Sequence, residues 1–95
     1  MFIRMIIAEV VSEEQIEEFL RLTKETMEES TRYKTLVSTY DLMKEAGGNM
    51  VILITKHHNR DAAIEFHSSR EARQLVAKTQ HLLLGSFVVK MFDNI

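Results

Sequence analysis

The spacing of hydrophobic and polar residues predicts four strands and two helical regions. Residues 2–11 are apolar at almost every position, which is typical of a strand that is covered on both faces. In residues 13–31, apolar side chains recur three and four positions apart, and this spacing predicts an amphipathic helix. Ser12, followed three positions later by Gln15, has the pattern of a capping box at the start of that helix.

The rest of the chain continues the alternation of strands and helices. Asn59 and Ser69 each stand directly before a helical pattern, where a side-chain oxygen can cap the first backbone amides. Gly47 and Gly48 permit the positive φ angles of a tight turn. The predicted elements are a strand over residues 34–44, a turn over 45–49, a strand over 50–58, a helix over 59–66, a second helix from Ser69 to Gly85, and a strand over 86–92.

This order, β-α-β-β-α-β, predicts an α+β fold of the ferredoxin-like type over a single domain, residues 1–95. In that fold, helices cover one face of an antiparallel four-stranded sheet. The strands over residues 2–11, 50–58 and 86–92 are nevertheless apolar on both sides. We therefore expect a second copy of the chain to cover the other face, which gives a homodimer.

Composition excludes several classes of function. The 95-residue chain has a net charge of -2, so it lacks the basic field that holds a nucleic-acid backbone. It contains no cysteine, which excludes disulfides, iron–sulfur ligation and thiolate catalysis. No apolar run reaches the roughly 18 residues that a membrane-spanning helix needs, and the first apolar stretch lacks the pattern of a signal peptide. We expect no nucleic-acid or membrane partner, and a cytoplasmic location.

Several segments follow one another in a recognisable order: STYDL, VILITKHH, DAAIEFHSS and LLLGSFVVKMF. The most specific are AAIEFH at residues 62–67 and the LLLGSFVVKMF ending at residues 82–92. Together they resemble the antibiotic-biosynthesis monooxygenase (ABM) superfamily of dimeric α/β barrels, which has an acidic–alanine–leucine–histidine helix and a leucine-pair–glycine–strand ending. The resemblance runs nearly end to end. It implies two sheets that face each other in a dimer and, in each chain, a pocket between sheet and helices.

The ABM superfamily is chemically mixed. Some members oxygenate aromatic polyketides or quinols without metal or flavin, others degrade haem, some isomerise small sugar-like signals, and many have no assigned activity. His58 takes the place of a tryptophan that often closes the third strand, and the candidates for an asparagine of the oxygenating members are apolar here, namely Ile54 and the Ile6–Ile7 region. The resemblance alone therefore implies a fold and a range of activities.

Three of the four histidines lie within residues 56–69 and are candidates for chemistry. His57 and His58 are neighbours on a strand, so their side chains point to opposite faces and cannot share one metal ion. We expect no metal site, and we expect His57 to be solvated at the strand end. His58 either faces the pocket or lies in solvent. His67 is either a helix-terminal residue that interacts with the dipole or a general base, since an imidazole suits proton abstraction near neutral pH.

The remaining candidates would contact a substrate. Tyr40 could donate a hydrogen bond to a developing oxyanion, or it could be a core residue with its hydroxyl at the edge. Arg4 interrupts an apolar strand, so it either holds an anionic substrate or pairs with an acid such as Glu9 or Asp93. The predicted pocket is completed by Ile54, Lys56 and Phe66.

The resemblance to the ABM superfamily, together with these candidate residues, implies a cofactor-independent monooxygenase that acts on an aromatic or enolisable small molecule. His67 would be the general base, with His58 or Tyr40 stabilising the substrate anion. The anion would pass an electron to O2 inside a dry pocket. Two alternatives stay open: an isomerase of a small sugar-like signal, which would use the same base, and a non-catalytic dimeric ligand-binding or stress-response module.

Overall fold

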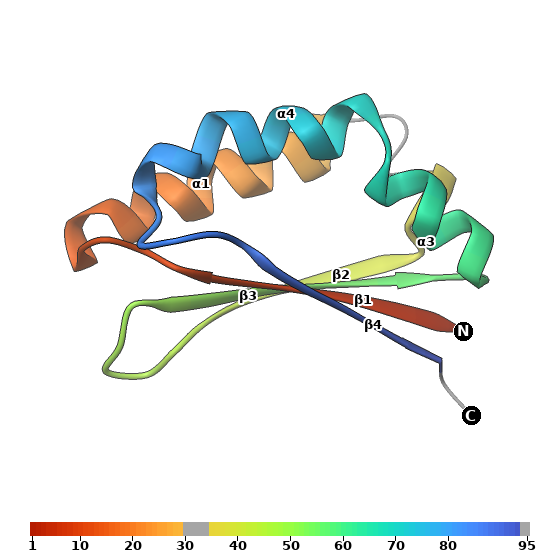
Figure 1. Cartoon of the computed structure of the whole chain (residues 1–95), viewed down its shortest axis with the longest axis horizontal. Coiled ribbons are helices and arrows are strands. Elements are labelled where there is room, and N and C mark those ends of the chain that lie inside the picture. Colours follow the sequence, from red (N-terminus) through yellow and green to blue (C-terminus); the bar gives the residue numbers. More distant parts are fainter. Residues whose placement is uncertain (30–34, 94–95) are drawn as a thin grey trace.

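The computed structural model describes residues 1–29 and 35–93, which form a four-stranded sheet with helices on one side (Figure 1). The strands are β1 (Phe2–Glu9), β2 (Thr39–Lys44), β3 (Met50–His57) and β4 (Val88–Asp93). The helices are α1 (Glu13–Glu29), α3 (Arg60–His67), α4 (Arg70–Thr79) and the 3₁₀ turn η1 (Gln80–Leu82). The predicted fold class, a ferredoxin-like α+β arrangement with an antiparallel four-stranded sheet, is confirmed.

The strands are ordered β2-β3-β1-β4 in the sheet, and each neighbouring pair is antiparallel. β1 and β3 occupy the centre, where Ile6 lies opposite Leu53 and Arg4 opposite Thr55. Residues that lie directly opposite one another point to the same face of the sheet. The even-numbered residues of β1 therefore share a face with the odd-numbered residues of β3.

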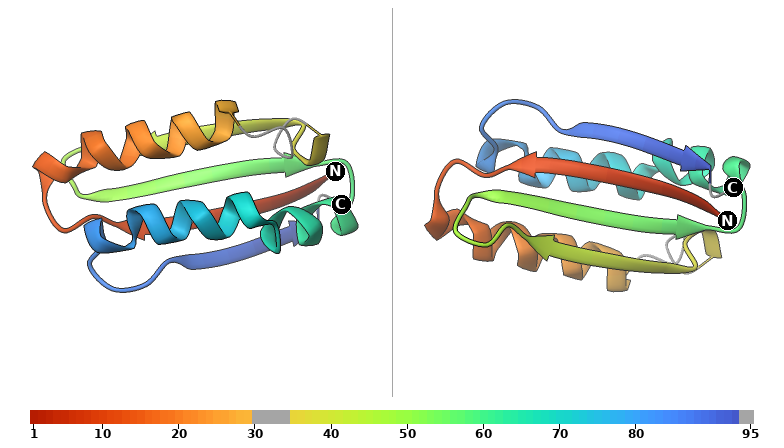
Figure 2. Two further views of the ribbon diagram at one scale, coloured as in Figure 1. Left: turned by 90° about the horizontal axis from the view of Figure 1, so that it is seen from above. Right: turned by 90° about the horizontal axis from the view of Figure 1, so that it is seen from below.

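The two faces of the sheet differ in what covers them. The helices of the described residues lie over one face, and the view from below in Figure 2 shows strands with no helix in front of them. The helix-covered face carries Phe2, Arg4, Ile6, Ala8, Val51, Leu53, Thr55 and His57, all of them buried. The other face, here called the open face, is apolar at most positions: Ile3, Met5, Ile7, Met43, Met50, Ile52, Ile54, Val88 and Phe92.

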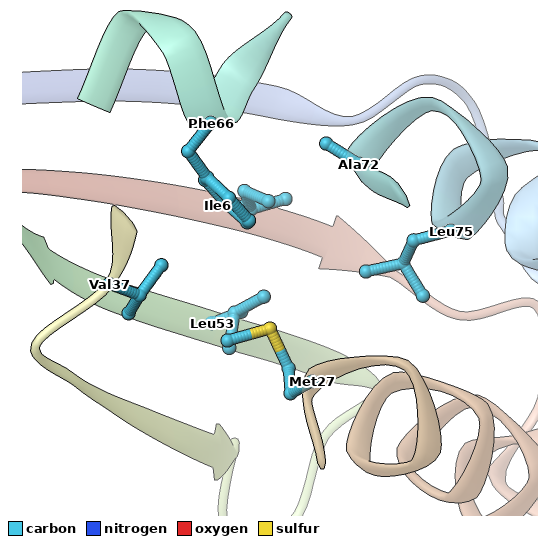
Figure 3. Packing of buried hydrophobic residues seen from close by; sticks show 7 residues of the cluster. All are labelled: Ile6, Met27, Val37, Leu53, Phe66, Ala72 and Leu75. Carbon is cyan, nitrogen blue, oxygen red and sulfur yellow. The ribbon is translucent and has the colours of Figure 1, made fainter. Parts of the chain in front are cut away.

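The core lies between the helices and the covered face of the sheet. Phe66 of α3, Leu75 of α4 and Met27 of α1 pack over Ile6 and Leu53 of the two central strands (Figure 3). Phe66 is fully buried, so α3 is held against the sheet by its second-to-last residue. This packing determines where the next side chain, at the end of α3, can lie.

Side-chain caps set the positions of the two later helices, as predicted. The Asn59 side chain accepts a hydrogen bond from a backbone amide in the first turn of α3 at 2.8 Å, and the Ser69 hydroxyl does the same for α4 at 3.1 Å. The capping box predicted for α1 takes another form, because the Ser12 hydroxyl lies 3.4 Å from the side-chain oxygen of Gln15 rather than bonding a backbone amide.

Some predicted boundaries differ from the observed ones. α4 ends at Thr79 and η1 follows it, so the helix stops well before Gly85. Gly85 instead adopts a φ of 91° in the loop that leads to β4, a conformation that favours glycine. β2 begins only at Thr39. The predicted end of the first helix near residue 31 and the predicted strand start at residue 34 lie outside the described residues.

Candidate functional site

A buried arginine meets the last residue of α3 on the helix-covered side of the sheet. Arg4 on β1 is only 3% exposed, and its guanidinium donates to Nδ1 of His67 from Nε at 3.1 Å and from Nη2 at 2.9 Å. The His67 side chain itself is exposed. The pair therefore joins a buried positive charge to an imidazole that solvent or a ligand can reach.

Phe66 supports this pair from within the core. The guanidinium carbon of Arg4 lies 5.2 Å from the centroid of its ring, a distance typical of a cation–π contact. α3 thus contributes two neighbouring side chains with different tasks. Phe66 anchors the helix in the core, and His67 remains at the surface beside Arg4.

His57 is fully buried, so the prediction that it is solvated at the strand end is wrong. It lies opposite Phe2 and therefore on the helix-covered face. Its Nδ1 is 2.8 Å from the backbone carbonyl oxygen of Leu36, which can only accept, so Nδ1 carries a proton and donates. Its Nε2 lies 2.8 Å from the hydroxyl of Thr55, which donates to the neutral ring. Both ring nitrogens are occupied, and His57 is a structural residue of the core.

Burial and the charge of Arg4 favour the neutral form of both histidines. Burial lowers the pKa of His57 below its ordinary value of 6.5; the hydrogen bond to the Leu36 carbonyl offsets part of this effect, and the charge of Arg4 adds to the lowering. His67 is exposed at its surface, but its partial burial beside Arg4 also lowers its pKa, and the charge of Arg4 lowers it further. Near neutral pH, the Arg4–His67 pair therefore carries one positive charge, on the guanidinium.

A cavity of about 240 Å³ opens beside Arg4 and His67. Its lining belongs to β1, α3, α4, β4 and the loop before β4, and it includes Ile6, Phe87 and Val89 as apolar walls and Arg73 as a second cation. None of the lining residues is a carboxylate. The volume lies just below the roughly 300–1,000 Å³ typical of ligand pockets. The cavity suits a compact molecule that has an apolar body and an oxygen able to accept hydrogen bonds.

A wider hollow of about 660 Å³ lies along the outer surface of α1 and is lined mainly by charged side chains. Arg21 forms an ion pair there with Glu25 at 3.0 Å, and both side chains are at least half exposed. Such pairs are ordinary on a solvated helix surface. This hollow brings together no histidine or buried polar group, so the cavity beside Arg4 is the candidate site.

Of the predicted site residues, the structure brings together Arg4, Phe66 and His67. Tyr40 lies on the same covered face, because it is opposite Thr55 on β3. It packs partly buried against the core and does not line the cavity beside His67.

The structure places the other three predicted residues elsewhere. β3 presents its odd-numbered residues to the helices, so Ile54 and Lys56 lie on the open face. His58 follows the end of β3 and is exposed. The prediction that Ile54 and Lys56 line the pocket is therefore wrong, and of the two alternatives for His58 the structure shows the one in solvent.

Several residues of the site were missed by sequence reasoning, among them Arg73, Phe87 and Val89. One signal was present in the two central strands: Arg4, Thr55 and His57 share one face, while the open face of β1 and β3 is large and aliphatic at most positions. Using that signal requires the register between β1 and β3, because a shift by one residue exchanges the faces.

Within residues 1–29 and 35–93, no group of three histidine, cysteine, aspartate or glutamate side chains is arranged to hold a metal ion. The helices in this part of the chain are all too short or too polar to cross a membrane.

Comparison with solved structures relates this arrangement to one group of proteins. A structure described as an antibiotic biosynthesis monooxygenase matches with a TM-score of 0.81 over 100% of this chain and 99% of that chain, at 21% sequence identity. This chain has the ABM fold. A candidate antibiotic biosynthesis monooxygenase from Nitrosomonas europaea has a TM-score of 0.83 at 14% identity, over 100% of this chain and 99% of that one.

A third structure, of a protein from Mycobacterium tuberculosis, has a TM-score of 0.79 at 19% identity and covers 100% of this chain and 96% of that one. No protein-family model matches the sequence, and no curated protein matches it either. The fold of the single chain that the resemblance to the ABM superfamily implied is thereby confirmed.

Proposed function

We propose that the chain is an ABM-type enzyme that oxygenates a compact aromatic or enolisable molecule in the cavity beside Arg4 and His67, without a metal or other cofactor. The Arg4–His67 contact at the edge of an apolar cavity carries this proposal. A guanidinium beside apolar walls favours a molecule with a hydrophobic body and an oxygen that gains negative charge. The ABM fold supports the same function.

The proposed reaction requires an anion of the substrate and molecular oxygen. In an anthrone, the methylene carbon loses a proton, and the negative charge spreads to the carbonyl oxygen, where Arg4 and His67 stabilise it. The anion passes one electron to O2, and the two radicals join to form a peroxide anion at that carbon, which takes back from water the proton that the carbon released. Loss of water from the peroxide leaves a new carbonyl. One oxygen atom enters the product, the other leaves as water, and the carbon loses two hydrogens.

We propose in addition that the enzyme is a homodimer joined through the open face. Met43, Val88 and Phe92 on this face are each 45–48% exposed, which is unusual for side chains of this size on a contiguous apolar surface. A twofold axis would bring the same face of two chains together and bury it on both.

The proposed reaction is tested by a screen of quinols, anthrones and enolisable sugar phosphates, followed by oxygen uptake and product analysis. Oxygen uptake with an anthrone or a quinol supports the monooxygenase. Conversion of a sugar phosphate without oxygen uptake would favour the isomerase. Binding of these compounds without turnover would favour the ligand-binding module.

The variant His67→Ala tests whether His67 contributes to the rate of the proposed reaction, and His58→Ala is the matched control. We expect His67→Ala to lower kcat/KM by about 10²–10³, the usual cost of losing one hydrogen bond to a developing oxyanion. His58 is exposed beyond the end of β3, so His58→Ala should leave the rate unchanged. Equal effects of the two variants would contradict the placement of the site.

A further inference from the structure

The contact with Arg4 determines which nitrogen of His67 carries the proton. Both guanidinium hydrogen bonds end on the same atom, Nδ1, at 2.9 and 3.1 Å. A guanidinium has only donors and stays protonated in proteins. If Nδ1 also carried a proton, the N–H groups of Arg4 would point at the N–H group of His67, and no hydrogen bond could form. The neutral ring must therefore carry its proton on Nε2.

We propose that His67 is a hydrogen-bond donor through Nε2–H rather than a general base, that Arg4 is the positioning residue that fixes this tautomer, and that the cavity takes a substrate that ionises in water before it binds. This inference rests on the proposed function and names its substrate class: acidic enols and phenols, bound as enolates or phenolates. It replaces the role of base that the sequence predicts for His67.

The hydrogen bonds from Arg4 leave neither ring nitrogen of His67 able to accept a proton from a substrate. Nδ1 is occupied by Arg4, and Nε2 has no partner within the described residues but bears the proton. To act as a base, His67 would also have to become an imidazolium. Partial burial and the charge of Arg4 lower the pKa of His67 and so oppose that change. Both observations favour a ring that keeps its single proton throughout the reaction.

No other side chain that lines the cavity is a base. None of the residues that line the cavity is a carboxylate, and the other titratable side chains of the lining, Arg4 and Arg73, are donors. His57 is fully buried, with both ring nitrogens bonded to Leu36 and Thr55. A lining without a base fits a substrate whose proton has left to water before binding.

The same groups are well suited to hold an anion. An enolate or phenolate oxygen can accept from Nε2–H, and the guanidinium groups of Arg4 and Arg73 add positive potential at the cavity. Since Nε2–H is fixed before the substrate arrives, little reorganisation is needed when the anion binds. Electron transfer from the bound anion to O2 then starts without a proton transfer to the protein.

The first test measures the tautomer directly in the full-length protein without substrate. Long-range proton–nitrogen NMR spectra of protein labelled with ¹⁵N-histidine show which ring nitrogen carries the proton. The signal of His67 is identified by its loss in His67→Gln, and His81→Gln serves as the matched control at an exposed position. We expect Nε2 protonated and Nδ1 unprotonated at neutral pH. A proton on Nδ1, a mixture of tautomers or an imidazolium would overturn the inference.

The positioning role of Arg4 is tested by the same spectra of Arg4→Met. Without the guanidinium, the ring should populate both tautomers and its pKa should rise. An unchanged tautomer in the folded variant would show that Arg4 does not fix it. If this buried substitution prevents folding, the spectra of the unsubstituted protein still decide the tautomer.

The second test uses the pH dependence of oxygen uptake with a series of phenols or enols that differ in acidity. If the substrate binds already ionised, the inflection of kcat/KM should move with the pKa of each compound. A general base on the enzyme would instead give one inflection for the whole series. His67→Gln keeps an N–H donor and has no basic nitrogen, so it should stay within about tenfold of the original rate while His67→Ala loses about 10²–10³.

Equal losses in His67→Gln and His67→Ala, or a fixed inflection, would overturn the donor role. If no compound is oxygenated, the proposed function fails, but the NMR result still decides the protonation of His67. The two failures are therefore distinguishable.

Discussion

The imidazole of His57 packs against the ring of Phe66, with their centroids 5.6 Å apart and their planes inclined by 38°. Phe66 also contacts the guanidinium of Arg4. One aromatic side chain thus joins the buried histidine of β3 to the buried arginine of β1, and it links the stability of the core to the position of the candidate site.

We expect Phe66→Ala to lower the free energy of unfolding by about 3–5 kcal/mol, because it leaves a cavity under α3 and removes the contacts with His57 and Arg4. Denaturant unfolding at a fixed protein concentration measures this loss. Ile64→Ala on the same helix is the control, since Ile64 is 44% exposed and should change stability little. Similar losses in both variants would contradict the central role of Phe66.

The stability of the fold should decrease as the pH falls below 6.5. Burial lowers the pKa of His57, so the unfolded chain binds a proton more readily than the folded one. The stabilisation by neutral His57 is therefore complete above pH 6.5 and is lost as the pH falls through the lowered pKa of the folded state. Each such histidine can contribute a slope of at most about 1.4 kcal/mol per pH unit, which urea unfolding at several pH values measures.

His57→Gln identifies the group that is responsible for this slope. Glutamine can keep a hydrogen bond but does not titrate, so the pH slope should become shallower in this variant. The slope that remains should reflect His67, whose pKa is lowered in the same direction. His81→Gln, at an exposed position in η1, should leave the slope unchanged. If His57→Gln leaves the pH slope of stability unchanged, the slope arises from other groups.

A substitution at the centre of the open face tests whether the chain forms a homodimer. Met43, Ile52, Ile7 and Val88 lie opposite one another in a row across all four strands, so Ile52→Lys would place a charge in the middle of an apolar interface. Light scattering should show a dimer for the original chain at micromolar concentration and a monomer for Ile52→Lys. Such an interface should bury well over about 1,000 Å². A stable monomer of the original chain would contradict the proposal, and Ile64→Lys on α3 is the control.

Treatment with a chelator should leave oxygen uptake and thermal stability unchanged. The chain has no cysteine, and its described part brings no three suitable side chains together around a metal. Elemental analysis and an absorption spectrum of the purified protein check this expectation. Stoichiometric zinc or iron, or the spectrum of a flavin, would contradict it.

Local patterns in the sequence were sufficient to predict the fold. The caps Asn59 and Ser69 and the apolar spacing of α1 act over a few residues, so their effect can be read without knowing the tertiary structure. Arg4 and His67 were also recognisable, because a cation in an apolar strand and a histidine at a helix end are both local signals.

The faces of β3 could not be predicted in the same way. His57 is buried and Lys56 is on the open face because Arg4 lies opposite Thr55, a pairing between residues far apart in the sequence. The contribution of Arg73 and Val89 to one cavity likewise depends on how α4 and β4 pack, and no short pattern encodes that arrangement.

The first and last described strands enter the sheet side by side, with Phe2 at the start of β1 opposite Asp93 at the end of β4 (Figure 1). Tension applied to the two ends of the chain would pull these antiparallel neighbours apart from one side. The hydrogen bonds between them run perpendicular to the strands, so they would break one pair at a time rather than together. We therefore expect β4 to separate from β1 first, at low force. Val89 would then leave the wall of the cavity together with β4. Mechanical load would open the site while β1, β3 and their helices remain packed.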